Sequence, residues 1–95
     1  MFPFSTALVT GASSGIGEVM VGLLADAGVP TVVVARRRDR LDALAARYGG
    51  IEVLVADLGT AAGQASVAAR IADPDRPIDL VVNNAGFGTN GAFHE

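Results

Sequence analysis

The chain has 95 residues, of which 51% are apolar and 18% are charged, and its formal net charge at pH 7 is −3. This length allows one small domain at most, and the composition is that of a packed core rather than of a disordered segment. The negative net charge argues against nucleic acid and acidic membranes as partners, and the absence of cysteine excludes disulfides and thiolate metal sites.

The amino-terminal stretch lacks the features of a targeting sequence. "MFPFSTALVTG" (1–11) has no basic start and no apolar run long enough for a signal peptide. The longest apolar runs, such as "TVVVA" (31–35), are far shorter than the roughly 20 residues of a membrane span. We therefore expect a soluble protein of the cytoplasm, a reducing compartment that suits a cysteine-free chain.

Four short apolar runs predict strands. They are "TALVT" (6–10), "TVVVA" (31–35), "IEVLVA" (51–56) and "DLVVNN" (79–84). Valine-rich runs that are apolar on both faces are typical of a parallel sheet covered by helices on both sides.

Three segments between these runs predict helices. The first stops at Gly28, the second stops at Gly49, and the third begins after Thr60, a suitable N-cap, although Gly63 weakens it. Apolar residues recur at helical spacing in each: Ile16, Met20, Leu23, Leu24 and Ala27 in the first, Leu41, Leu44, Ala45 and Tyr48 in the second, and Ala65, Ala68, Ile71 and Ala72 in the third.

The order β-α-β-α-β-α-β predicts an α/β protein, the N-terminal half of a doubly wound parallel-sheet Rossmann fold with sheet order 3-2-1-4. The fourth strand would then be an uncovered apolar edge. We expect residues 1–95 to form a partial domain that is truncated before its second half. The alternative is a four-stranded unit that folds alone.

A glycine-rich loop, "TGASSGIG", joins the first strand to the first helix. Gly11 permits a tight turn, Gly15 lets the backbone approach a pyrophosphate, and Gly17 lets the helix pack on the sheet. The helix N-terminus faces the phosphates, and Ser13 and Ser14 add hydroxyl donors. The spacing G-x-x-x-G-x-G differs from the general dinucleotide fingerprint, and without a Lys-Ser/Thr pair it is not a P-loop. The alternative is a glycine-rich turn with no ligand.

Three motifs occur in order along the chain: "TGASSGIG" (10–17), an Asp-Leu pair after the third strand, and "NNAG" (83–86) after the fourth. Together they resemble the short-chain dehydrogenase/reductase family over essentially all 95 residues. The resemblance implies an NAD(P)-binding Rossmann domain, in an oxidoreductase that interconverts a carbonyl and an alcohol by hydride transfer. The family's cofactor-binding positions correspond here to Gly11, Ser13, Ser14, Gly15, Ile16, Gly17, Asp57, Leu58, Asn84, Ala85 and Gly86.

The resemblance also implies a role for each of these motifs. The glycine loop contacts the adenine ribose and the pyrophosphate. The Asp57 carboxylate accepts a hydrogen bond from the adenine amino group, and Leu58 lies beside the ring. Residues 84–86 lie against the adenine-side ribose and the middle of the cofactor, whereas Asn83 ties neighbouring strands together. Without the motifs, Asp57 would be interpreted as a solvated cap of the following helix.

The end of the second strand bears on which nicotinamide cofactor is used. NAD-binding members carry an aspartate there, which accepts hydrogen bonds from the ribose diol, but this chain has Arg36 followed by Arg37. A guanidinium binds a 2′-phosphate through charge-assisted hydrogen bonds, whereas a carboxylate repels it. We therefore predict NADP (NADPH) as the cofactor and assign both arginines to the phosphate. The alternative is a solvated basic start to the second helix, with two acidic partners: Asp39 and Asp42.

The catalytic residues that the resemblance implies are missing from these 95 residues. The family uses a Y-x-x-x-K pair, in which the lysine lowers the pKa of the tyrosine, and an upstream serine. The only tyrosine, Tyr48, is followed by "GGIE", and all seven basic residues are arginine. The one histidine, His94, is expected to be exposed beside the terminus. We therefore assign no catalytic residue and no metal site.

These observations predict the N-terminal cofactor-binding portion of an NADP(H)-dependent oxidoreductase. We expect its full-length parent to act on a small carbonyl or alcohol compound as a homo-oligomer, with neither nucleic acid nor membrane as a partner. The substrate and the direction of the reaction stay open. One alternative is a non-catalytic NADP(H)-binding module that shields its fourth strand against another chain. Another is a Rossmann-like methyltransferase, for which an acidic ribose ligand is expected at the end of the second strand.

Overall fold

Strands and helices alternate in the computed structural model of the chain, which describes residues 5–12 and 15–83. Each strand lies within the range predicted for it from the sequence, and the three predicted helices are present. The strands are β1 (Ala7–Thr10), β2 (Thr31–Ala35), β3 (Ile51–Val55) and β4 (Leu80–Asn83), and the helices are α1 (Gly15–Asp26), α2 (Arg38–Arg47) and α3 (Ala61–Ala72).

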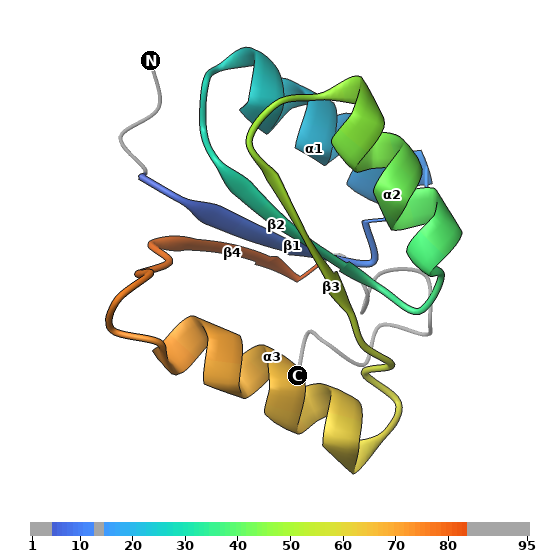
Figure 1. Ribbon diagram of the computed structural model, residues 1–95, viewed down its shortest axis with the longest axis vertical. Helices are drawn as coiled ribbons and strands as arrows, with labels where there is room; N and C mark the ends of the chain where they lie inside the picture. The colour runs from blue at the N-terminus through green and yellow to red at the C-terminus, as the bar shows by residue number, and fades with distance from the viewer. Residues whose placement is uncertain (1–4, 13–14, 84–95) are drawn as a thin grey trace.

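The four strands form one parallel sheet in the order β3-β2-β1-β4. Helices α1 and α2 cover one face of this sheet, and α3 lies on the opposite face (Figure 1). The predicted α/β class and the sheet order 3-2-1-4 are therefore confirmed.

Both faces of the two central strands are buried, as the valine-rich runs predict. On the face covered by α1 and α2, Val9 and Val33 pack with Leu24 and Leu41. On the other face, Val32 and its neighbours pack against α3. Successive side chains of a strand point to opposite faces, so a strand that is buried on both sides is apolar at most positions. The burial of every residue of β1 and β2 follows from this arrangement.

The buried face of α1 differs from the sequence pattern. Gly17, Val21 and Leu24 face the sheet, whereas Ile16 and Leu23 are 60% and 56% exposed. Apolar residues occur almost all around this helix. Two different sets of residues, one with Ile16 and Leu23 and the other with Val21 and Leu24, therefore recur at helical spacing. The small Gly17 side of the helix packs on the sheet because it allows the closest approach of the two backbones.

The pattern assigned to α3 is also not its buried face. Gly63, Val67 and Arg70 are buried, whereas Ala65, Ala68, Ile71 and Ala72 are exposed. Alanine gains little from burial because it removes little apolar area from water, so an alanine stripe does not fix the orientation of a helix. The single large aliphatic residue on the other side, Val67, carries more of that area and packs against the sheet.

The second helix and the cap of the third agree with the sequence. Leu41 and Leu44 are buried, and Tyr48 is half-buried against the same core cluster. Thr60 caps α3, since its hydroxyl oxygen accepts a hydrogen bond of 3.0 Å from the Gly63 N–H. Tyr48 is thus a packing residue in this part of the chain.

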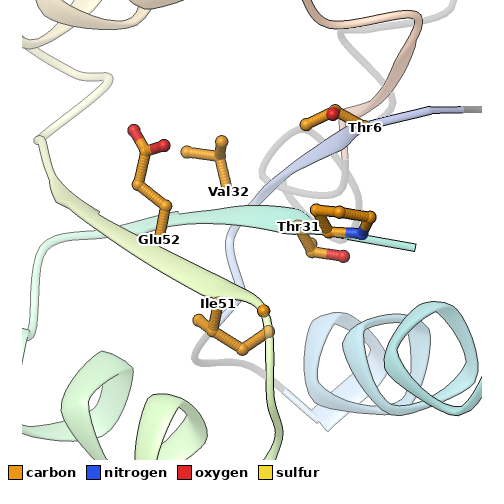
Figure 2. A pocket seen from close by; sticks show the side chains of 7 residues that line it. Thr6, Thr31, Val32, Ile51 and Glu52 are labelled. Carbon is orange, nitrogen blue, oxygen red and sulfur yellow. The ribbon is translucent and has the colours of Figure 1, made fainter. Parts of the chain in front are cut away.

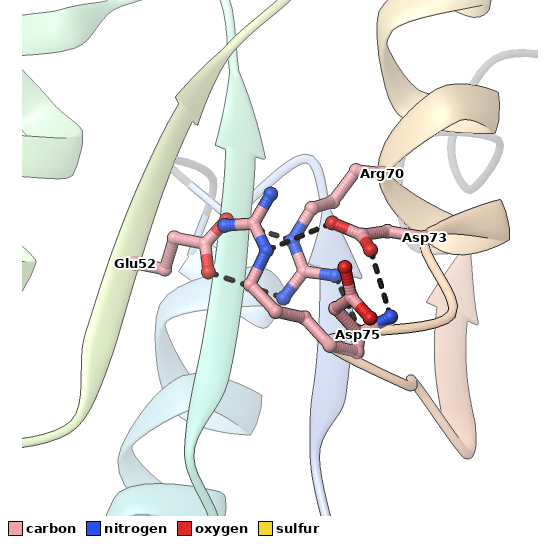
Figure 3. Close-up of polar contacts among 5 residues, drawn as sticks. Glu52, Arg70, Asp73 and Asp75 are labelled. Carbon is pink, nitrogen blue, oxygen red and sulfur yellow. Dashed lines mark hydrogen bonds and ion pairs between the residues drawn. The ribbon is translucent and has the colours of Figure 1, made fainter.

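A buried arginine joins α3 to the sheet. The Arg70 side chain, only 7% exposed, donates from Nε to Glu52 Oε2 at 2.8 Å and from Nη2 to Oε1 at 3.1 Å. Its Nη1 donates to the Arg76 carbonyl oxygen at 2.7 Å. Arg76 in turn pairs with Asp73 at 2.9 Å, so the cluster fastens the loop after α3 to β3 (Figure 3). The sequence did not reveal this cluster, because an arginine within an alanine-rich helix is ordinarily solvated.

We expect Glu52→Gln to lower the free energy of unfolding by about 1 kcal/mol at pH 7, since the carboxylate is 38% exposed and solvent screens part of its interaction. The hydrogen bonds from Arg70 hold the pKa of Glu52 below its ordinary value. The stabilisation is therefore present above the ordinary pKa of a glutamate and is lost as the pH falls through the lower pKa of the folded state. Urea denaturation of the wild type and of the Glu52→Gln variant, at pH 7 and at pH 3, measures how much the substitution lowers the free energy of unfolding at each pH. Asp26→Asn, at the exposed end of α1, is the control and should change stability little at either pH. An equal effect of Glu52→Gln at both pH values would contradict the role of the charge.

Candidate cofactor-binding site

The carboxyl ends of three neighbouring strands meet at one edge of the sheet. Thr10 of β1 lies beside Val34 of β2, and Val34 lies beside Leu54 of β3. The loops after these strands therefore start from adjacent points, at the edge where doubly wound sheets bind ligands. They contain three of the predicted cofactor-binding residues: Gly11, Arg36 and Asp57.

Backbone hydrogen bonds fasten these loops to one another. The Ala12 N–H donates to the Val34 carbonyl oxygen at 3.1 Å, which holds the glycine turn against β2. The Ala56 N–H donates to the Ala35 carbonyl oxygen at 3.0 Å, which holds the loop after β3 against the end of β2. Each bond lies next to a predicted site residue, so the relative positions of the three loops are set by the backbone.

The described part of the glycine loop has the expected shape. Gly11 has a φ of 65°, a conformation that L side chains rarely adopt and that the predicted tight turn requires. Gly17 is buried in the first turn of α1, and the space beside Gly15 is open with respect to the described residues, since beyond its chain neighbours and its own helix backbone none of their heavy atoms would lie within 4 Å of a Cβ atom there. Ile16 is exposed between them. The predicted phosphate-facing residues Ser13 and Ser14 lie outside the described residues.

The arginines after β2 do not share one environment. Arg36 is exposed and forms no ion pair with any residue that the structure describes. Arg37 donates from Nε and Nη2 to the two carboxylate oxygens of Asp39, at 3.2 and 3.1 Å. Arg38 pairs with Asp42 at 3.8 Å, one helical turn further on. The acidic partners named in the alternative interpretation, Asp39 and Asp42, thus pair with Arg37 and Arg38. The contact of Arg37 with the 2′-phosphate stays a prediction.

This pairing also affects the carboxylate. The hydrogen bonds from Arg37 hold the pKa of the Asp39 carboxyl below its ordinary value. The loop after β2 therefore presents alternating charges rather than a purely basic surface. Among the described arginines at this edge of the sheet, Arg36 is the one without an acidic partner, so no carboxylate competes with a phosphate for its guanidinium.

Asp57 forms the turn that leads into α3. Its Oδ1 accepts a hydrogen bond of 2.8 Å from the Gly59 N–H, and its carbonyl oxygen accepts one of 3.0 Å from the Thr60 N–H. Thr60, rather than Asp57, caps the helix. The Asp57 side chain remains exposed, whereas Leu58 is half-buried against the core cluster below α3. The contact of both residues with adenine stays a prediction.

The last described residue, Asn83, links the two strands next to the glycine loop. Its Oδ1 accepts a hydrogen bond of 3.0 Å from the Thr10 hydroxyl, which connects the ends of β1 and β4. The predicted structural role of Asn83 is confirmed by this bond. Asn84, Ala85, Gly86 and His94 lie outside the described residues.

The described surface has two shallow hollows, and neither is lined by Gly11, Arg36 or Asp57. One, of about 250 Å³, lies at the opposite end of the sheet, where β2 and β3 begin (Figure 2). Its lining residues are Thr6, Pro30, Thr31, Val32, Gly50, Ile51 and Glu52. The other, of about 210 Å³, lies between α1 and α2 and is lined by Glu18, Arg40, Ala43, Leu44 and Arg47.

Two kinds of feature are missing from the described part of the chain. Within 5–12 and 15–83, no group of three or more histidine, cysteine or acidic side chains is arranged to hold a metal ion. Over the same residues, no helix has both the length and the apolar character that crossing a membrane requires.

Comparison with known proteins adds to this geometry. Residues 5–95 match the family model for short chain dehydrogenase. Galactitol 2-dehydrogenase of Rhizobium johnstonii is 42% identical over 88 residues, which are 90% of this chain and 34% of that protein.

Solved structures of dehydrogenases also superpose on this chain. An alcohol dehydrogenase from Comamonas testosteroni, described as specific for bulky-bulky ketones, superposes with a TM-score of 0.82 and 40% identity, over 99% of this chain and 40% of its own. A short-chain dehydrogenase from Sphingobium yanoikuyae, in complex with NADPH, has a TM-score of 0.73 and 45% identity, over 79% of this chain and 32% of its own. The chain thus spans between 32% and 40% of the length of these three proteins.

Proposed function

Since the chain belongs to the short-chain dehydrogenase family, we propose that it is the cofactor-binding portion of an oxidoreductase that uses NADP(H). The observation that carries the cofactor preference is Arg36. It directly follows β2, at the carboxyl edge of the sheet, and it is exposed and without an ion pair among the described residues. The NADPH complex of the Sphingobium yanoikuyae relative supports the same choice of cofactor.

The residues at this edge fit such a cofactor. The tight turn at Gly11 and the open space beside Gly15 let the backbone and the start of α1 approach a pyrophosphate. Arg36 would hold the 2′-phosphate. The exposed carboxylate of Asp57, whose loop is hydrogen-bonded to the end of β2, would accept a hydrogen bond from the adenine amino group. The cofactor, when bound, supplies the hydride.

The remaining chemistry is assigned to other parts of the whole protein. The chain contains no lysine, and its one tyrosine is half-buried in the core, so the proton-transfer pair expected of this family is not assembled from these residues. We infer that the whole protein interconverts a small carbonyl compound and an alcohol, in the cytoplasm and as a homo-oligomer. A non-catalytic NADP(H)-binding module remains the second candidate, because the described residues include no proton donor suited to that reaction.

Titration with NADPH and NADH, followed by the fluorescence of the reduced nicotinamide, tests the cofactor assignment. We expect NADPH to bind more than tenfold tighter, because one hydrogen-bonded charge pair contributes about 1.5–3 kcal/mol. Circular dichroism checks that the protein is folded. Equal affinities would contradict the NADP(H) preference, and a folded protein that binds neither cofactor would contradict the site. Ketone-dependent oxidation of NADPH by the full-length protein separates an enzyme from a binding module.

A further inference from the structure

The arginine that follows Arg36 is already engaged. Two nitrogens of the Arg37 guanidinium face the two oxygens of Asp39, at 3.2 and 3.1 Å. Bidentate pairing of this kind is also how arginine binds a phosphate. The carboxylate therefore occupies the part of Arg37 that a phosphate group would use.

The surroundings of the pair make it accessible to a ligand. Arg37 is the N-cap residue of α2 and Asp39 lies in the first turn, next in space to the loop that carries Arg36. Their side chains are 60% and 68% exposed, so water screens the pair and its stability is small. An exposed pair of this kind can exchange its carboxylate for a competing anion. The negative charge of Asp39 also repels a nearby anion, and more strongly once Arg37 no longer neutralises it.

We propose that Asp39 is a positioning residue for cofactor specificity, which holds Arg37 away from the 2′-phosphate and thereby weakens the preference for NADPH over NADH. This inference rests on the proposed function, because it assumes that the loop after β2 binds the 2′-phosphate. Arg36 then supplies the recognition, and Arg37 is an additional ligand that its neighbour restrains.

The substitution Asp39→Asn in the full-length protein tests the proposal. It removes the charge and keeps the shape, so we expect the dissociation constant of NADPH to fall about two- to fivefold, the range set by an exposed ion pair. The dissociation constant of NADH is expected to stay unchanged, because NADH lacks the 2′-phosphate. Asp42→Asn is the matched control: it changes the net charge equally and releases Arg38 instead of Arg37. Its effect on NADPH should be clearly smaller.

A double substitution separates competition for Arg37 from other effects of the charge. In an Arg37→Met background, Asp39→Asn should have no more effect than Asp42→Asn. Unchanged or weaker NADPH binding by Asp39→Asn, in a protein that prefers NADPH, would overturn the inference and leave the proposed function standing. A parallel change in NADH affinity would overturn it as well, because it would indicate a structural role. A wild-type protein without any preference for NADPH would contradict the proposed function itself.

Discussion

The substitution Gly63→Ala is expected to destabilise the protein by about 2 kcal/mol, the upper end of the cost of overpacking less the gain in helix propensity. A Cβ at this position in α3 would overlap the Asp57 carbonyl oxygen and would lie 2.8 Å from the Asp57 nitrogen. These are backbone atoms, which cannot rotate away as the end of a flexible side chain can. Overpacking of this kind typically costs 1–3 kcal/mol and sometimes more, and about 1 kcal/mol of it is offset by the higher helix propensity of alanine.

Urea denaturation followed by circular dichroism measures this loss. The matched control is Gly49→Ala, since a Cβ at Gly49 would meet no described residue within 4 Å apart from its chain neighbours, and its φ is not in the left-handed region. The control should remain within about 0.5 kcal/mol of the wild type. A Gly63→Ala protein that is as stable as this control would show that α3 does not pack closely on the turn at Asp57.

Gly63 also illustrates how far the sequence predicts this fold. In the sequence it only weakens a helix, because its reason for being glycine is a contact with a turn that precedes the helix. The strands were easier to predict: β1 and β2 are apolar at all positions except Thr10 and Thr31, as expected for strands that are covered on both faces. The face of α3 was predicted wrongly because its alanines gain little free energy from burial, while the burial of Arg70 depends on a partner in β3, Glu52.

The candidate site, like the fold, could be predicted from the sequence only in part. A parallel sheet brings the loops after β1, β2 and β3 to one edge whatever their side chains are, so the neighbourhood of Gly11, Arg36 and Asp57 follows from the order of the elements. The charge pairing in the loop after β2 does not follow from the order of the elements. Whether Arg37 is held by Asp39 or points to a ligand depends on side-chain rotamers, which the sequence spacing leaves open.

The second large effect concerns Arg36. We expect Arg36→Ala to weaken NADPH binding about 10- to 100-fold, because each hydrogen bond to a charged group contributes about 1.5–3 kcal/mol and no other arginine in the loop is equally unpaired among the described residues. Binding of NADH should change less than twofold. Arg40→Ala is the control, since it removes the same charge from the exposed side of α2, beside the hollow between the helices. A similar loss of NADPH binding in both variants would indicate a general effect of charge rather than recognition by Arg36.

The most direct measurement is isothermal titration of the wild-type protein and of the Arg36→Ala variant with 2′,5′-ADP and with 5′-AMP. The two ligands differ only in the 2′-phosphate, and neither carries the nicotinamide half of the cofactor. The geometry of the loop after β2 predicts that the wild type binds 2′,5′-ADP at least tenfold tighter than 5′-AMP and that Arg36→Ala abolishes most of this difference. Equal affinities of a folded wild-type protein for the two ligands would contradict the assignment of Arg36 to the 2′-phosphate and, with it, the preference for NADP(H).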